Sequence, residues 1–205
     1  MKISRKIVHL YRKVYNHFYS KQLKNYPTII SRDCIGGVLY SDYNLKFTSP
    51  TIGLEFTNDD FILFCNHLKS FVNCDLIEVK YKYPLGKLTC EYGTIYVHFK
   101  HYNNFNDALS AWNRRKLRID YNNIYIIMCI GPNYDEKIIR QFEKIKYKHK
   151  ILLSSGIDTN KYSNCFNMKC YDSNHNIDSL IQHKSKYGIK RYYDEVDWIK
   201  FFNER

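Results

Sequence analysis

The most constraining feature of this chain is a continuous apolar run over residues 124–130, which ends at Gly131-Pro132. An apolar run of this length between turn residues predicts a strand that is buried on both faces. Behind it, residues 135–145 place apolar side chains at helical spacing, and residues 150–153 predict another strand. The order strand, helix, strand, helix, strand over residues 94–153 therefore predicts right-handed crossovers onto a mainly parallel sheet.

We expect the α/β fold class, with a mainly parallel or mixed sheet flanked by helices in a three-layer, Rossmann-like arrangement and an N-terminal amphipathic helix. Residues 1–205 are expected to form one compact domain, with a less regular part at 155–205. Thr57 followed by Asp60 resembles a capping box and predicts a helix start. The other predicted strands are 28–30, 52–56, 76–79, 88–90, 94–99 and 165–171, and the other predicted helices are 38–43, 57–72, 106–118 and 194–202.

Residues 4–22 predict one amphipathic helix. Basic and polar side chains line one side of it, and the apolar positions on the other side are Ile7, Leu10, Tyr11, Val14, Tyr15 and Phe18. A basic amphipathic helix can lie on a membrane surface. Because this apolar face is rich in Tyr rather than in Leu and Phe, we expect it to dock on the protein's own core instead.

The chain is basic, with a formal net charge of +12. Such an excess can attract nucleic acid, an anionic membrane face or phosphorylated ligands. Alternatively, Lys, Asn, Ile and Tyr are abundant together, as an AT-rich coding sequence would produce, so the charge can be compositional. No stretch approaches the roughly 18 apolar residues of a membrane span. Arg5, Lys6, Arg12 and Lys13 interrupt any signal-like run, so we expect a chain that is neither secreted nor membrane-spanning.

Seven cysteines, an odd number without a Cys-x-x-Cys pair, are spread along the chain. This usage is typical of reduced thiols and predicts a cytoplasmic protein. Cys165 and Cys170 have no second ligand pair beside them, so we predict no zinc site. The sequence contains no Asp-x-Asp pair that would indicate a divalent metal, and it leaves any cofactor unknown.

A polar loop from Ser31 to Gly37 follows the predicted strand 28–30. In open α/β sheets, ligands bind beyond the carboxyl ends of strands, where helix N-termini present free amides. Amides at Gly36 and Gly37 could hold a phosphate or carboxylate, with Ser31 and Arg32 adding a hydroxyl and a charge. The alternative is that the glycines only make the turn, because the loop is not a complete dinucleotide or P-loop signature.

Two residues are candidate catalytic groups. Cys34, near a helix N-terminus, would have a lowered thiol pKa and could act as a nucleophile. His101, which follows the strand ending at Phe99, could be its base or an independent acid or base. The alternatives are a small buried cysteine and a hydrogen-bonded structural histidine.

The densest positive stretch is residues 112–118. Arg can hold phosphate bidentately beside a stacking indole, so Trp112, Arg115 and Arg118 are predicted to bind a nucleotide or sugar phosphate. The alternative is a solvated helix end whose cations offset the helix dipole, an interpretation we prefer for Arg114. The remaining predicted ligand-binding residues are Ser49, Thr51 and Tyr102.

Five ordered segments together resemble one bacterial family, domain-of-unknown-function family 1919, whose members are often labelled exopolysaccharide-biosynthesis proteins. The resemblance covers about residues 25–170 and rests on segments 30–37, 49–51, 83–86, 98–102 and 112–119. This chain departs from the family pattern at Arg32-Asp33, where small amides are typical, and at Ile35, where an aromatic residue is frequent. The resemblance implies a role in surface polysaccharide assembly but no particular reaction.

The leading hypothesis is a protein of unknown activity that acts in bacterial surface polysaccharide biosynthesis. It would bind an anionic small molecule, a phosphorylated or nucleotide-linked sugar, and resemble a transferase. One alternative is a basic nucleic-acid-binding protein, although no recognised nucleic-acid motif occurs. Another is a non-catalytic assembly factor that presents Trp112 and surface tyrosines to a partner.

Overall fold

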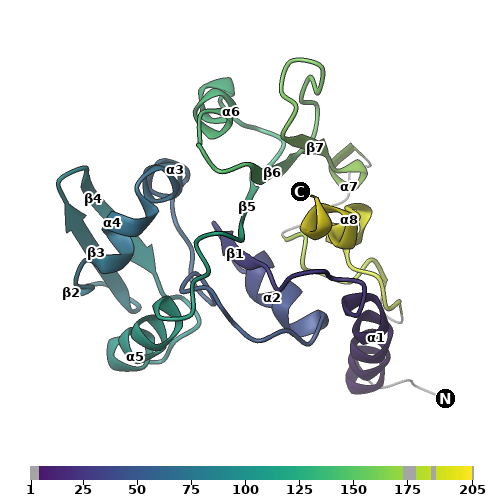
Figure 1. Ribbon diagram of the computed structural model, residues 1–205, viewed down its shortest axis with the longest axis horizontal. Coiled ribbons are helices and arrows are strands. Elements are labelled where there is room, and N and C mark those ends of the chain that lie inside the picture. Colours follow the sequence, from purple (N-terminus) through teal and green to yellow (C-terminus); the bar gives the residue numbers. More distant parts are fainter. Residues whose placement is uncertain (1–4, 173–178, 186–187, 205) are drawn as a thin grey trace.

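The computed structural model describes residues 5–172, 179–185 and 188–204, and it contains two separate sheets (Figure 1). One is parallel, with strand order β1-β5-β6-β7, and the other is antiparallel, with order β2-β3-β4. Helices flank both, so the α/β class is confirmed. The strands are β1 (Thr28–Ser31), β2 (Ile77–Val79), β3 (Leu85–Cys90), β4 (Gly93–His98), β5 (Ile124–Cys129), β6 (His149–Ser154) and β7 (Cys165–Asn167).

Strand β5 has its apolar character because both of its faces are covered. Ile124, Ile126 and Met128 join a hydrophobic cluster shared with the antiparallel sheet, whereas Tyr125 and Ile127 join a second cluster on the opposite face. Every residue of β5 is buried. The continuous apolar run is therefore the consequence of a two-residue side-chain period with a core on each side.

The helices form layers on the two faces of the parallel sheet. Helix α6 (Glu136–Glu143) lies in the crossover from β5 to β6 and buries Ile139 and Phe142 in the first cluster. On the other face, α2 (Ile35–Asp42) and α8 (Trp198–Asn203) contribute to the second cluster. The predicted helix 194–202 is divided into a 3-10 turn, Tyr192–Glu195, and α8. The short helix α7 (Lys169–Asp172) follows β7.

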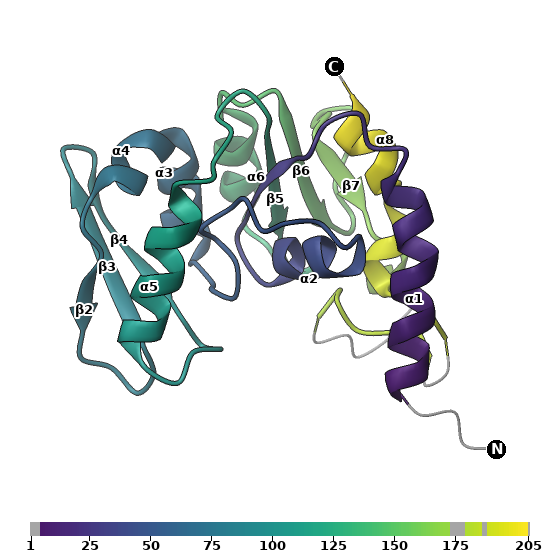
Figure 2. The same cartoon turned by 60° about the horizontal axis from the view of Figure 1, so that its bottom comes forward.

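The antiparallel sheet is the main departure from the predicted topology. Strand β4 was expected to enter the parallel sheet, but it pairs with β3 across Glu91-Tyr92-Gly93, which the sequence itself indicates as a hairpin-like turn, and β3 pairs with β2. Helices α3 (Asn58–Asn66), α4 (Leu68–Asn73) and α5 (Phe105–Lys116) cover this sheet (Figure 2). The predicted Thr57 cap is confirmed, because its hydroxyl accepts a hydrogen bond from the Asp60 amide at 3.2 Å.

Three other predicted elements differ in the structure. The single helix predicted over residues 57–72 is divided at His67 into α3 and α4. Residues 52–56 form no strand and make only one bridge, between Glu55 and His98. They are apolar because Leu54 and Phe56 are buried in a connecting segment between the two sheets. The expected strand 165–171 is shorter, because the chain turns into α7 after Asn167.

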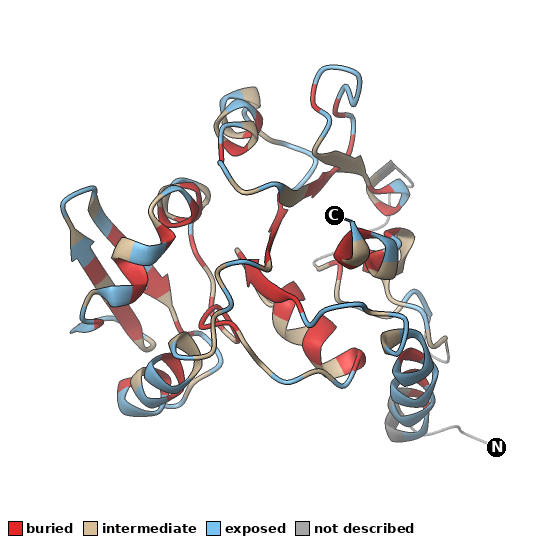
Figure 3. Cartoon of the chain, viewed as in Figure 1, coloured by how far each residue is buried: buried red, intermediate tan, exposed pale blue. Residues whose placement is uncertain are grey.

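Helix α1 (Arg5–Ser20) packs with the face opposite to the one we predicted. Its buried residues are Val8, Arg12 and Asn16, and the expected core-facing side chains, such as Leu10 and Phe18, are exposed. Figure 3 shows this helix largely exposed at the periphery of the molecule. The prediction that the apolar face docks on the protein's own core is therefore wrong.

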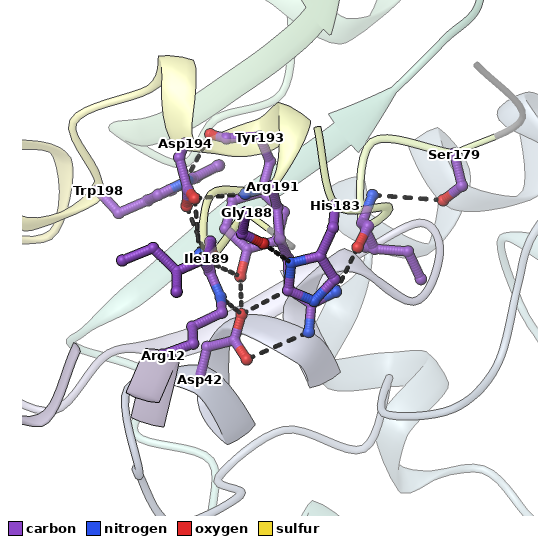
Figure 4. A network of polar contacts seen from close by, with 11 residues as sticks. Arg12, Asp42, Ser179, His183, Gly188, Ile189, Arg191, Tyr193, Asp194 and Trp198 are labelled. Atoms are coloured by element: carbon purple, nitrogen blue, oxygen red, sulfur yellow. Dashed lines mark hydrogen bonds and ion pairs between the residues drawn. The ribbon is translucent and has the colours of Figure 1, made fainter. Parts of the chain in front are cut away.

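A network of buried polar groups explains this orientation (Figure 4). Arg12 Nε donates to Asp42 Oδ2 at 2.6 Å, and its Nη atoms donate to both carboxylate oxygens of Asp194 at 2.7 and 2.8 Å. Arg191 Nε donates to the same Asp42 oxygen at 2.8 Å. The network joins α1, α2 and the C-terminal segment, and a buried Arg is tolerated because each of its charged partners is close by.

Candidate functional site

The candidate site lies where the two sheets meet. Segment 55–56 joins them, because the Phe56 amide donates to the Arg32 carbonyl just after β1, while Glu55 pairs with His98 at the end of β4. The residues that follow the carboxyl ends of β1 and β4 are thereby brought together. We call this place the seam, defined by Arg32, Asp33, Cys34, Lys100 and His101.

Cys34 and His101 are in direct contact across the seam. Cys34 Sγ lies 2.9 Å from His101 Nε2, although the two residues are 67 positions apart in the sequence. Cys34 is the N-cap residue of α2 and is half-buried, whereas His101 is exposed on the loop before α5. This is the contact that a thiol and its base require for proton transfer.

The thiol is protonated at neutral pH. Burial raises the pKa of Cys34 to about 11, with the negative charges of Asp33 and Glu55 acting in the same direction and Lys100 opposing them. The lowered pKa predicted from the helix N-terminus is therefore wrong, because burial and two carboxylates dominate. A protonated thiol donates to Nε2, so nucleophilic reaction of Cys34 requires His101 to take its proton.

Arg32 contributes a cation with spare hydrogen-bonding capacity. Its Nη1 donates to the neutral Asn58 Oδ1 at 3.2 Å and its Nη2 to the charged Asp33 Oδ2 at 3.3 Å, and both distances are long for hydrogen bonds from a charged donor. Its buried Nε has no hydrogen-bond partner in the part of the chain that is described. Arg32 and Asp33 also line a cavity of about 200 Å³ beyond the carboxyl ends of β1 and β5, together with Gly131 and Tyr171.

The glycine-containing loop is occupied by its own side chains. Ser31 Oγ accepts from the Gly36 amide at 3.2 Å and donates to the Asp33 carbonyl at 2.8 Å, and Asp33 Oδ1 accepts from the Ile35 amide. Both Gly36 and Gly37 lie within α2 rather than before it. A Cβ on Gly36 would lie 2.4 Å from Ser31 Oγ, so this glycine permits close packing of α2 on β1.

Ser49 and Thr51 pack against the start of the same loop, at Ser31. Thr51 Oγ1 accepts from the Ser31 amide at 3.1 Å and lies 3.0 Å from Ser49 Oγ. Both residues are fully buried. Their hydroxyl groups thus fasten segment 49–51 to β1 and satisfy a buried amide.

Tyr102 and Arg115 hold the next part of this segment in place by hydrogen bonds. Arg115 Nη1 donates to the Ile52 carbonyl at 2.9 Å and to the Tyr102 hydroxyl at 2.8 Å, and the guanidinium lies over the Phe47 ring. Arg118 Nη1 donates to the Phe47 carbonyl at 3.2 Å. The predicted ligand-binding residues therefore converge, but most of them bind one another.

Trp112 does not line the site. Its side chain is only 1% exposed and contacts Phe64 in the core between α3 and α5. An indole in this position cannot stack on a ligand or form a protein interface, which corrects both interpretations of this residue. Its spacing from Arg115 placed them on one face, but the periodicity did not reveal that this face is the buried one.

Sequence reasoning missed two charged residues, Lys100 at the seam and Glu55 beside it. Lys100 Nζ donates a hydrogen bond to the Glu55 carboxylate, and both are partly exposed beside Cys34. Lys100 adjoins His101 in the sequence and could have been noticed for that reason. Glu55 could not, because its position depends on the bridge to β4.

Two kinds of feature are absent from the described ranges. No group of three or more His, Cys, Asp or Glu side chains there is placed to hold a metal ion. Likewise, no helix in the described part of the chain is long and apolar enough to cross a membrane.

The fold and site define an α/β protein with a thiol–imidazole pair at the junction of a parallel and an antiparallel sheet. The chain belongs to the family described as Domain of unknown function (DUF1919), which matches residues 6–203. It is also similar to an uncharacterized protein of Haemophilus influenzae, with 25% identity over 178 residues that cover 86% of this chain and 84% of that protein. The family resemblance predicted from the five segments is confirmed.

Proposed function

We propose that this protein binds a phosphorylated or nucleotide-linked sugar at the seam and acts there as a group-transfer enzyme of surface polysaccharide biosynthesis. The observation that carries the proposal is the 2.9 Å contact between Cys34 Sγ and His101 Nε2 beside a cationic side chain. In this role His101 takes and returns a proton, Cys34 is the nucleophile or proton donor, and Arg32 pairs with the anionic group of the ligand.

The other predicted residues support these three in the proposal. By binding segment 47–53 to β1 and α5, they fix the distance between the loop that follows β1 and the loop that follows β4. The residues with this positioning role are Ser31, Gly36, Gly37, Ser49, Thr51, Tyr102, Arg115 and Arg118.

A thermal-shift screen against nucleotide sugars, sugar phosphates and free nucleotides tests the proposal. A ligand present at 100 times its Kd stabilises the fold by about 2.7 kcal/mol, which raises Tm by several degrees. We expect Arg32→Gln to abolish the shift, while the matched control Arg114→Gln, on the exposed surface of α5, retains it. No shift of the wild-type protein with any of these ligands would refute the sugar-phosphate assignment.

The catalytic part of the proposal needs its own variants. We expect Cys34→Ala and His101→Ala to bind the ligand found in the screen but to lose turnover, whereas Cys90→Ala, outside the seam, keeps it. If Cys34→Ala retained full turnover, the thiol would have no part in the chemistry.

A further inference from the structure

Helix α1 presents an apolar surface that nothing in the described part of the chain covers. Leu10 and Phe18 are 62% and 61% exposed, and Ile7, Tyr11 and Val14 are exposed beside them. These five residues recur at spacings of three and four and form one stripe along the helix, which we call the apolar ridge. Contiguous apolar surface of this kind marks an interaction site more often than a scattered exposed side chain does.

The apolar ridge cannot turn inward without disrupting the fold. Arg12 and Asn16, on another side of the helix, are only 3% and 5% exposed, and Arg12 binds Asp42 and Asp194. Rotating the helix would leave the Asp42 carboxylate, which is fully buried, without one of its cationic partners. The outward direction of the apolar ridge is therefore built into the structure.

Cationic side chains border the apolar ridge. Lys13 lies along one edge of it, and Lys21, just beyond the end of the helix, holds its Nζ 5.3 Å from the centre of the Phe18 ring; both lysines are exposed. Lys24 extends the positive charge beyond the helix. The first 32 residues of the chain contain no Asp or Glu, so no acidic side chain of this segment offsets the charge.

We propose that α1 binds the anionic surface of a lipid bilayer, lying parallel to it. The apolar ridge would enter the boundary between headgroups and acyl chains, and the lysines at its edge would contact lipid phosphates. Tyr11, within the apolar ridge and 66% exposed, has an amphipathic ring that suits this boundary. Helix α1 lies at the opposite end of the molecule from the antiparallel sheet (Figure 1), and the proposal does not depend on a sugar ligand.

A second copy of the chain fits this surface less well. In an antiparallel twofold dimer, the same edge of both helices would meet, and each would bring Lys13 and Lys21. Since α1 contains no acidic residue, neither helix could neutralise the other. An anionic bilayer, in contrast, offers acyl chains to the apolar ridge and phosphate groups to the lysines at its edge.

Vesicle flotation of the whole protein tests the inference. We expect the wild-type protein to float with vesicles that contain phosphatidylglycerol, to float less at high salt, and to remain unbound with phosphatidylcholine alone. Lys13→Gln with Lys21→Gln should lower partitioning roughly 25-fold, at about fivefold for each lysine. Absence of wild-type flotation with anionic vesicles would overturn the proposal.

Matched pairs of variants test whether flotation depends on the apolar ridge or on exposed apolar side chains in general. Leu10→Glu with Phe18→Glu should abolish flotation, while Ile77→Glu with Leu117→Glu, at exposed apolar positions away from α1, should not. Circular dichroism and Tm should match wild type for both pairs, because all four side chains are exposed. Two outcomes would contradict the bilayer assignment. One is normal flotation of the Leu10/Phe18 double variant. The other is a wild-type protein that binds no vesicles and forms a dimer which this double variant converts to monomer.

Discussion

The buried polar network of Arg12, Asp42, Arg191 and Asp194, which we call the Arg12 network, can be compared with the seam. Both are clusters of charged and titratable side chains, but they differ in how many of their polar groups already have close hydrogen-bond partners. In the network, Arg12 and Asp42 are fully or almost fully buried, and each charged group has close partners between 2.6 and 2.8 Å. At the seam, the histidine is exposed, the arginine bonds are 3.2 and 3.3 Å long, and one buried donor lacks a partner in the described ranges.

The difference separates a structural role from a chemical one. A saturated buried network cannot accept a ligand without losing an existing bond, so its groups act on stability. Groups with unused donors at a partly exposed junction can bind a ligand with little loss. Changes in the network should therefore affect the free energy of unfolding, and changes at the seam should affect reactivity and binding.

The largest expected loss of stability follows from Asp42→Ala. The substitution leaves Arg12 and Arg191 beside a buried site without their shared carboxylate, and we expect the free energy of unfolding to fall by about 3–5 kcal/mol. Urea unfolding at neutral pH measures this, with Asp75→Ala at an exposed position between α4 and β2 as control. A loss below about 1 kcal/mol would mean that the network is not saturated as described.

The same carboxylate predicts a pH dependence. Burial alone would raise the pKa of Asp42, but hydrogen bonds from Arg191 and Tyr193 and the charge of Arg12 lower it overall. A lowered folded-state pKa contributes stability above the unfolded value of about 3.9 and loses it as pH falls further. Wild-type stability should therefore decrease below about pH 4 more steeply than that of Asp42→Asn.

The rate of alkylation of Cys34 tests the comparison at the seam. With a pKa of about 11, the thiol has far fewer thiolates at pH 7 than an ordinary cysteine. We expect iodoacetamide to modify it roughly a hundredfold more slowly than in the unfolded chain, with a rate that still rises between pH 9 and 11. A rate plateau near pH 7, measured on the Cys34 peptide by mass spectrometry, would show an activated thiolate instead.

Arg115→Ala should have an intermediate effect. It removes the hydrogen bonds to Tyr102 and to the Ile52 carbonyl, and we expect a loss of about 1.5–3 kcal/mol in the free energy of unfolding. Arg114→Ala, one residue earlier and exposed, should stay within about 0.5 kcal/mol of wild type. Equal effects of the two variants would contradict the fastening role of Arg115.

The smallest effect on stability is expected for His101→Ala. Because the imidazole is exposed, we expect a change within about 0.5 kcal/mol in thermal or urea unfolding. A loss above 2 kcal/mol would place His101 with the structural groups and remove the contrast between the two regions.

The local pattern of the sequence was sufficient for the elements whose burial follows from neighbours along the chain. The run 124–130 predicted β5, the 3.6-residue period predicted α6, and Thr57 with Asp60 predicted the start of α3. It failed for residues 52–56, which are apolar because they cross between two sheets. For the site, Cys34 and His101 could be selected from the sequence, and His101 could be named as one possible base for Cys34, but no local pattern places the two side chains 2.9 Å apart.

What the sequence determined by itself is the alternation of buried strands and helices, because hydrophobic period and capping act over a few residues. Tertiary structure alone decided which side of α1 faces inward and which loops meet at the seam. Arg12 is buried only because Asp42 and Asp194 lie beside it, and these partners are 30 and 182 positions away. Such pairings depend on where distant elements are placed, and no short-range pattern encodes them.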